Sequence, residues 1–239
     1  MPPPPPGPRF VTFFTSRETP RNTWLFDDFV TKKIPDSTVR RLSHYLRSLE
    51  GFEEPGGTVS SEELAARGQT TAAQVRKDLS HFGSFGKRGL GYRVDALRAH
   101  LRGILGVDRH WRVALVGAGR IGLALFEYPA FRARGYDCVA IFDADPEKVG
   151  TTRAGLTIRD PSQFEDAVRD LGIELVILAV PEAAAQEMAG RAVEAGVKGI
   201  LNFAPIRLNV PPRVPVEDVN LVMELEALSF AITQAEHDA

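Results

Sequence analysis

The residues whose types and spacing most clearly indicate a chemical function in this sequence are three glycines. Gly117, Gly119 and Gly122 follow the apolar run Val113 to Val116, a pattern typical of a strand that leads into a phosphate-binding turn. In such a turn the first glycine permits the bend, the second lets the backbone approach a pyrophosphate, and the third lets the next helix pack on its strand. The spacing therefore predicts a dinucleotide site.

An acidic residue lies where a site of this kind needs one. A second apolar run, Cys138 to Phe142, ends at Asp143, roughly 20 residues after the glycines. The Asp143 carboxylate can accept a hydrogen bond from a ribose 2′-hydroxyl but would repel a 2′-phosphate, and Ala144 supplies no arginine to compensate. Asp143 and Ala144 together favour NAD(H) over NADP(H) as the ligand.

Composition limits the class of protein. The chain has 239 residues, 44% of them apolar and 25% charged, and we expect two domains. No apolar run approaches the roughly 18 residues of a membrane span and no signal-peptide pattern opens the chain, so we expect a cytoplasmic protein. The single cysteine, Cys138, excludes a disulfide within the chain, and no metal site is expected.

The two parts of the chain carry opposite charge. Residues 32–110 hold 14 basic and nine acidic side chains, whereas residues 111–239 hold 12 and 19. A basic segment joined to an acidic one indicates that the first part, and not the second, meets a polyanion.

Residues 1–33 open with five consecutive prolines, Pro2 to Pro6, and show no sustained period. We interpret them as a disordered or loosely docked arm, since polyproline cannot form a helix or a central strand. A translation start placed too far upstream and a proline-rich partner motif are the alternatives.

Residues 34–110 are predicted to begin with three short helices. Asp36 or Ser37 can cap the first, whose buried face would consist of Val39, Leu42, Leu46 and Leu49. The second begins with the capping box of Ser60 and Glu63 and stops at Gly68. The third repeats the capping pattern at Thr71 and Gln74, buries Val75, Leu79 and Phe82, and stops at Gly83. Three such helices are typical of a helix-turn-helix unit.

The outward face of the third helix is suited to nucleic acid. It carries Gln74, Arg76, Lys77 and Ser80, with Asp78 as the one opposing acid. The segment from Ser84 to Val94 then interleaves glycines with Lys87, Arg88 and Arg93, as in a flexible basic hairpin or wing. We predict a helix in the major groove and a wing at an adjacent minor groove. A solvated basic face on a protein-interaction module is the alternative.

After the wing, residues 95–105 are expected to form a linker helix and residues 106–110 a hinge. Strands and helices then alternate. Strands are predicted at 113–116, 138–142, 175–180 and 199–203, with helices at 121–126, from a Ser162 cap through Leu171, and at 183–195. Two strand tips would add residues to the dinucleotide site, because ligands bind outside the carboxyl ends of such strands. They are Val180, Pro181, Asn202, Phe203 and Ala204.

The tail from Leu221 has apolar residues at 221, 225, 228 and 232, the spacing of a helix with one apolar stripe. It could fold back on its own subunit or cross to a partner, and the pattern favours neither.

An NAD-dependent dehydrogenase with a helical appendage is the main rival class. It would need a proton donor, yet the histidines, at 44, 81, 100, 110 and 237, all lie outside the predicted dinucleotide segment, the last of them in the tail. Tyr128, Tyr136, Lys148 and Lys198 form no recognisable constellation, so no catalytic residue is expected. A third interpretation keeps the fold and replaces the ligand with coenzyme A.

Five motifs, in this order and spacing, closely resemble the Rex family of redox-sensing transcriptional repressors. They are QVRKDLSHFGSFGKRGLGY (Gln74 to Tyr92), VGAGRIGLAL, IFDADPEKVG, AVPEAAAQ and GILNFAPI. The resemblance covers about residues 34–236. It implies an N-terminal winged-helix DNA-binding domain (34–110), a Rossmann-like NAD(H)-binding domain (111–220) and a C-terminal helix (221–239) exchanged in a homodimer.

The resemblance also implies a function. The dimer would bind a palindromic operator of respiration and fermentation genes when NADH is scarce and leave it when NADH rises. By position, the DNA contacts would be Gln74, Arg76, Lys77 and Ser80, with Lys87, Arg88, Gly89 and Gly91 in the wing. The cofactor contacts would be Gly117, Ala118, Gly119, Arg120, Ile121, Gly122, Asp143, Ala144, Asp145, Lys148, Val180, Pro181, Asn202, Phe203 and Ala204.

The chain departs from the family pattern in two places. Members usually have an aspartate where Asn220 stands, and its charge is thought to switch between partners equivalent to Arg47 and Tyr92. Asn220 can still hydrogen-bond but lacks that charge. His81 replaces a frequent tyrosine.

Overall fold

The computed structural model describes residues 34–52, 56–83, 86 and 89–238. The proline-rich arm and the wing residues Lys87 and Arg88 lie outside this range. The chain divides into two compact units between Leu97 and Arg98, within one helix rather than after the expected hinge. Each unit is described by itself below.

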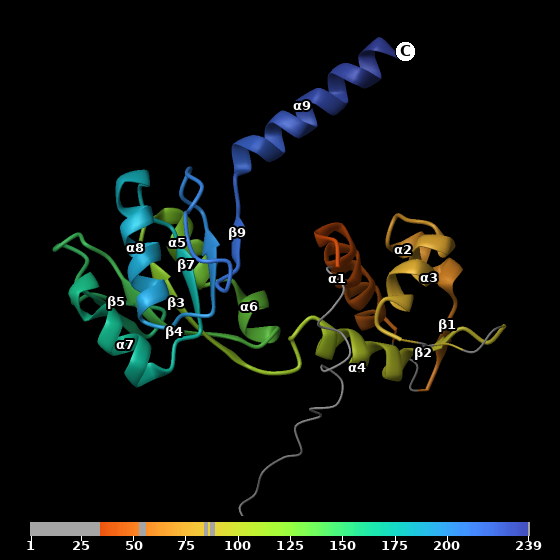
Figure 1. Cartoon of the computed structure of the whole chain (residues 1–239), viewed down its shortest axis with the longest axis horizontal. Helices are drawn as coiled ribbons and strands as arrows, with labels where there is room; N and C mark the ends of the chain where they lie inside the picture. Colours follow the sequence, from red (N-terminus) through yellow and green to blue (C-terminus); the bar gives the residue numbers. More distant parts are fainter. Residues whose placement is uncertain (1–33, 53–55, 84–85, 87–88, 239) are drawn as a thin grey trace, which may run out of the picture. The chain divides into compact units, whose positions relative to one another are not determined.

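The first unit contains helices and one small sheet, drawn in orange and yellow in Figure 1. Its elements are α1 (Asp36–Glu50), β1 (Thr58–Val59), α2 (Ser61–Arg67), α3 (Ala72–Ser80), β2 (Tyr92–Arg93) and the start of α4 (Val94–Ile104). The expected capping box at α2 is confirmed, with Ser60 and Glu63 each bonding the other's backbone N–H. The three predicted helices therefore form where the sequence places them.

Several details of this unit differ from the prediction. Pro35, not Asp36 or Ser37, stands at the N-cap of α1, and Val39 is 42% exposed because it lies off the buried stripe. Helix α3 ends at Ser80, before Gly83. The wing is also built differently: β2 pairs antiparallel with β1, which precedes α2, so its strand partner comes from outside the segment 84–94.

The most consequential difference is Asp78, expected on the outer face of α3. Its side chain is buried and accepts hydrogen bonds from Tyr45 (2.9 Å) and, through both carboxylate oxygens, from Arg41 (2.6 and 2.8 Å). Thr38 at 3.4 Å and Gln74 at 2.7 Å add two more donors. A carboxylate removed from water needs such partners. This Asp78 cluster ties α3 to α1.

The cluster changes the protonation behaviour of its members. Burial opposes ionisation of Asp78, but the hydrogen bonds from Arg41, Gln74 and Tyr45 outweigh it and lower its pKa. Burial, together with the hydrogen bond to Asp78, raises the pKa of Tyr45 to about 12. Over the ordinary pH range the Asp78 carboxyl group is therefore ionised and the Tyr45 phenol is neutral.

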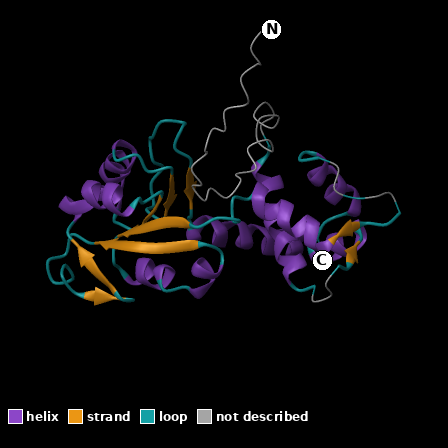
Figure 2. Cartoon of the chain, turned by 90° about the horizontal axis from the view of Figure 1, so that it is seen from below, coloured by secondary structure: helices purple, strands orange, loops and turns teal. Residues whose placement is uncertain are grey.

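The second unit is a seven-stranded sheet with the strand order β5-β6-β4-β3-β7-β8-β9, drawn in orange at the left of Figure 2. The strands are β3 (Trp111–Val116), β4 (Tyr136–Phe142), β5 (Thr152–Arg153), β6 (Leu156–Arg159), β7 (Leu175–Leu178), β8 (Gly199–Asn202) and β9 (Val216–Asp218). Every neighbouring pair is parallel except β5 and β6. The chain starts at central β3, moves to one side, then returns to the other, so the order reverses between β3 and β7. This is the doubly wound arrangement, and it confirms the predicted α/β class.

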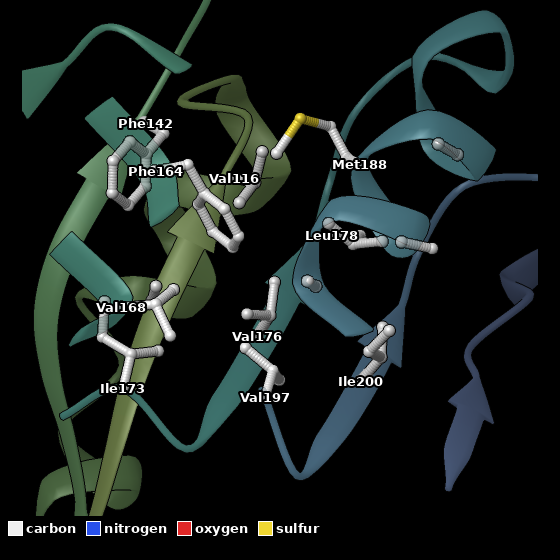
Figure 3. Close-up of a cluster of buried hydrophobic side chains, with 14 of the residues drawn as sticks. Val116, Phe142, Phe164, Val168, Ile173, Val176, Leu178, Met188, Val197 and Ile200 are labelled. Atoms are coloured by element: carbon white, nitrogen blue, oxygen red, sulfur yellow. The ribbon is translucent and has the colours of Figure 1, made fainter. Parts of the chain in front are cut away.

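Helices cover both faces of this sheet. Helices α7 (Phe164–Leu171) and α8 (Glu182–Glu194) pack on one face, where Phe142 and Phe164 meet edge to face, as Figure 3 shows. Helices α5 (Arg120–Phe126) and α6 (Pro129–Ala133) pack on the other through Phe126 and Phe131. Strands buried on both faces have continuous apolar runs, which is why β3 and β7 could be predicted from sequence.

Smaller predictions in this unit were wrong. Strand β7 ends at Leu178, so Val180 lies in the following loop. Asp160, and not Ser162, accepts the capping hydrogen bond ahead of α7. The short strands β5, β6 and β9 and helix α6 were not predicted.

The final helix, α9 (Leu221–His237), is exposed along its whole length in the single chain and extends beyond β9 in Figure 1. Its apolar side chains are more than half exposed, from 51% for Ile232 to 67% for Phe230. None of the helices described is long and apolar enough to cross a membrane.

Substitution of Tyr45 tests the Asp78 cluster. The Tyr45 pKa is raised above its unfolded value, so its contribution to stability is present below about pH 10 and is lost as pH rises through about 12. Tyr45→Phe should therefore be less stable than the parent at pH 8 by about 1 kcal/mol, and the difference should narrow above pH 10. Denaturant titrations at each pH measure it. Tyr128→Phe, in the other unit, is the control, and a gap that is independent of pH would contradict the expectation.

Candidate functional site

Four segments meet at the carboxyl edge of the large sheet, and all the sequence-predicted cofactor residues lie on them. They are the turn after β3 with the first residues of α5 (117–122), the loop after β4 (143–148), the loop after β7 (179–181) and the last residue of β8 with the two that follow it (202–204). The edge next to the reversal between β3 and β7 is where ligands bind in doubly wound sheets. The structure thus brings together segments that are up to about ninety residues apart in sequence.

Two of the glycines are required by close packing within this edge. Gly117 has φ +100°, and a Cβ there would lie 2.3 Å from the carbonyl oxygen of Ala179. A Cβ on Gly122 would lie 2.2 Å from the carbonyl oxygen of Gly117. Both distances are far below van der Waals contact, so only glycine fits.

Gly119 differs from its neighbours. A Cβ added there would meet no atom within 4 Å, and its φ of −80° suits any residue. No steric contact within the described part of the chain therefore requires glycine at 119. Gly119 is the N-cap of α5, where glycine is favoured over alanine, and its open backbone also fits the contact that a pyrophosphate makes with the second glycine of such a turn.

Asp143 connects the second loop to the glycine turn. One carboxylate oxygen accepts from the Ala118 N–H at 2.7 Å, and the other accepts from the Asp145 N–H at 2.8 Å. Lys148 donates to Asp143 at 3.1 Å and lies 3.5 Å from Asp145. Hydrogen bonding to Asp143 and the charges of both acids raise the Lys148 pKa, so this group of two carboxylates and one ammonium has a net charge of −1. Because each carboxylate oxygen can accept more than one hydrogen bond, Asp143 can still accept from a ribose hydroxyl.

The two remaining loops present a mainly apolar border. Val180 and Phe203 are half-buried, Ala204 is buried and Pro181 is exposed. Asn202 does not face outward: it is fully buried and bonds to the backbone of Ile206 (2.8 Å) and Ala204 (3.0 Å) and to the side chain of Asp218 (2.8 Å). Its evident role is to shape this loop, and direct contact with a ligand remains a prediction.

Around the glycines, the outer positions are open. Arg120 and Ala144 are exposed, and Ile121 is 56% exposed despite being apolar.

In the first unit, four of the predicted DNA-contacting residues lie on α3. Lys77 and Ser80 are exposed, and Gln74 is half-buried. Arg76 is also exposed but pairs with Ser61 (2.7 Å) and Glu62 (3.2 Å) of α2. Helices α2 and α3 and the wing glycines, with Gly89 and Gly91 at positive φ, line an open groove of about 870 Å³.

The predicted switch residues are distributed over both units. Arg47 is exposed on α1 and Tyr92 is half-buried in β2, whereas Asn220 caps α9 by accepting from the N–H groups of Val222 and Met223. Within the single chain, Asn220 therefore serves as a helix cap.

Sequence reasoning did not identify Arg41, Tyr45 and Asp218, the partners of Asp78 and Asn202. A signal existed for the first two. Arg41 and Tyr45 are four residues apart on one face of α1, and Asp78 is an acid on an otherwise basic helix. Asp218 had no signal, because β9 is too short to be predicted.

The two parts of the chain define a class: a winged-helix unit with a basic recognition helix, followed by a dinucleotide-type sheet. Residues 33–80 match the family described as "Putative DNA-binding protein N-terminus", and residues 108–206 match "CoA binding domain".

Full-length relatives identify the family. The chain is 48% identical to the redox-sensing transcriptional repressor Rex of Carboxydothermus hydrogenoformans, over 84% of this chain and 97% of that protein. It is also 48% identical to Rex of Thermus thermophilus, over 84% and 94%. The chain belongs to the Rex family of redox-sensing transcriptional repressors.

Solved structures agree with this assignment. A crystal structure of RSP, a Rex-family repressor, in complex with NAD+ and operator DNA has a TM-score of 0.81 at 36% identity, covering 86% of this chain and 95% of that one. RSP in complex with NADH has a TM-score of 0.76 at 34% identity, covering 86% and 97%.

Alanine substitutions separate packing from ligand approach in the glycine turn. Gly122→Ala should lose about 1–3 kcal/mol of stability, because its Cβ would collide with the Gly117 carbonyl. Gly119→Ala should lose no more than about 1 kcal/mol of stability, the cost of an alanine at a helix N-cap, but should bind NADH at least tenfold more weakly, because its Cβ lies where a pyrophosphate would approach. Thermal melts and titrations of NADH fluorescence measure the two effects. Normal NADH binding by Gly119→Ala would contradict this interpretation of the turn.

Proposed function

We propose that this protein is an NADH-responsive repressor that binds operator DNA through α3 and the wing and releases it when NADH occupies the carboxyl edge of the large sheet. The observation that carries the proposal is Gly119, a glycine that the protein's own packing does not require, beside an acid hydrogen-bonded to the same turn. The names of the relatives, and the NAD+, NADH and operator DNA bound to RSP, support it.

The charge around Asp143 favours NADH over NADPH. An unpaired Lys148 would attract a 2′-phosphate, but two carboxylates already engage its ammonium group. The net negative charge would repel the phosphate, whereas Asp143 can accept a hydrogen bond from a 2′-hydroxyl. Asp143 also disfavours coenzyme A, the alternative ligand suggested by the family name "CoA binding domain".

Sensing a redox ratio requires NADH to be distinguished from NAD+, whose nicotinamide ring carries a positive charge. The side chains after β7 and β8 that border the site are mainly apolar, among them Val180 and Ala204. Burying an unpaired cation against such a surface is unfavourable, so the neutral ring of NADH is preferred there.

The distribution of proton donors supports a regulatory rather than a catalytic role. Lys198 pairs with Glu174, and His110 lies 2.8 Å from Asp137, both pairs close to the amino ends of the strands and away from the cofactor edge. Lys148 is at the right edge but is engaged by the two acids. We therefore assign the cofactor the role of a signal, in a protein that acts on DNA in the cytoplasm.

Helix α9 is suited to joining two subunits. At 100° per residue, Leu221, Leu225, Leu228 and Ile232 form one apolar side, and Met223 and Phe230 lie on the opposite side. A helix that is apolar on two sides needs cover on both. This requirement is met if α9 inserts between the two units of a partner chain, and it favours a homodimer that binds a palindromic operator.

Reciprocal titrations test the proposed function. NADH should lower operator affinity, and by linkage operator DNA must lower NADH affinity by the same factor. A factor of about 5–150 is typical of coupled sites. Gel shifts with NADH, with NAD+ as the control, give one side of the cycle, and NADH fluorescence with and without operator gives the other. Equal NADH affinity in both conditions would refute the proposal.

Charge placed on α9 tests the dimer. Leu225→Glu would put a carboxylate into the apolar contact and should shift the protein to monomers, with at least tenfold weaker operator binding. Glu224→Gln, at the neighbouring exposed position, is the matched control and should remain dimeric. Sedimentation equilibrium measures the mass. A Leu225→Glu variant with the parent's mass would exclude this role for α9.

A further inference from the structure

Among the predicted DNA-contacting residues that the structure describes, Gln74 is the one whose side chain bonds to the buried Asp78. Its side-chain nitrogen donates to Asp78 at 2.7 Å, one helical turn further along α3, while the residue stays half-buried near the start of the helix. The first residues of a recognition helix are those that contact base edges. Gln74 therefore lies at the boundary between the buried Asp78 cluster and the DNA-facing surface.

The cluster determines which end of the Gln74 amide faces inward. Asp78 accepts from Arg41, Tyr45 and Gln74 and, as an ionised carboxylate, can only accept. The carbonyl oxygen of Gln74 would be repelled at that position, so the amide cannot turn over. One N–H is used, and one N–H and the carbonyl oxygen remain for an outside partner.

This remaining donor and acceptor match one base. In the major groove adenine offers a donor at N6 beside an acceptor at N7, whereas guanine offers acceptors at both O6 and N7. An amide that turned over would direct its oxygen inward and present two N–H donors, which suit the two acceptors of guanine. The amide as Asp78 holds it presents one N–H and its oxygen, which can pair with N7 and N6 of adenine but would leave the oxygen facing an acceptor of guanine.

We propose that Gln74 reads an adenine in each operator half-site, and that Asp78 is the positioning residue that sets the direction of the Gln74 amide. This inference rests on the proposed DNA-binding function. It assigns Asp78 a second task besides tying α3 to α1, and the two tasks use different partners. Tyr45 bonds the carboxylate oxygen opposite the one that Gln74 uses.

Selection from a pool of randomised DNA duplexes, with the full-length chain and no NADH, tests the proposal. The parent should select one adenine per half-site that Gln74→Ala no longer selects, with a preference of about tenfold falling to about twofold or less. Asp78→Asn should relax the preference between adenine and guanine, because an asparagine can face Gln74 with either its oxygen or its nitrogen. Tyr45→Phe is the matched control: it loses a hydrogen bond to the same carboxylate but should keep the base profile.

The outcomes distinguish a failure of this inference from a failure of the proposed repressor function. If the parent selects no sequence, the proposed function and this inference both fail. If it selects an operator and Gln74→Ala selects the same one, only the inference fails. A base profile changed by Tyr45→Phe as much as by Asp78→Asn would reduce Asp78 to a structural role and overturn its assignment. If Asp78→Asn does not fold, Gln74→Ala still shows whether the adenine is read. Gln74→Glu, which places a carboxylate against Asp78, then tests whether Asp78 positions the side chain at 74. An unchanged adenine preference in Gln74→Glu would overturn the positioning role of Asp78.

Discussion

The cofactor edge depends on one hydrogen bond, from the Ala118 N–H to the carboxylate of Asp143. It joins the turn after β3 to the loop after β4, and Gly117 and Gly122 can pack closely around that turn only because neither has a Cβ. The acid that would recognise a ribose is therefore also the acid that holds the phosphate-binding turn in shape. Electrostatic recognition is most effective when its groups are fixed in advance, and here the protein's own backbone fixes them.

Much of this arrangement could be predicted from the sequence, because the strongest signals are local. The apolar runs of β3 and β7, the capping box at Ser60 and the spacing of the glycines each arise within about ten residues of chain. The comparison of Gly119 with Gly117 and Gly122 could not be predicted. All three glycines fit the pattern, and only the neighbouring atoms distinguish the two that packing requires from the one with open space beside it.

The errors have a common physical origin in contacts between distant residues. Asp78 was placed on the outer face because its neighbours are basic, but Arg41 and Tyr45, more than thirty residues earlier, make a buried position favourable. The hydrogen bonds of Asn202 to Asp218 and to the loop backbone were likewise not foreseen, and its contact with a ligand stays a prediction. Buried polar residues find their partners through tertiary structure, and sequence spacing does not reveal such partners.

The exposed apolar surface of α9 has a consequence for how the protein is made and used. If α9 joins two subunits as proposed, a newly synthesised chain exposes this apolar helix until it binds a second copy, and assembly is a bimolecular step whose extent rises with expression level. If only the paired form occupies an operator, occupancy at low abundance grows with the square of the chain's concentration. The quantity of repressor in the cell would then set the threshold of the response alongside the nucleotide that it senses.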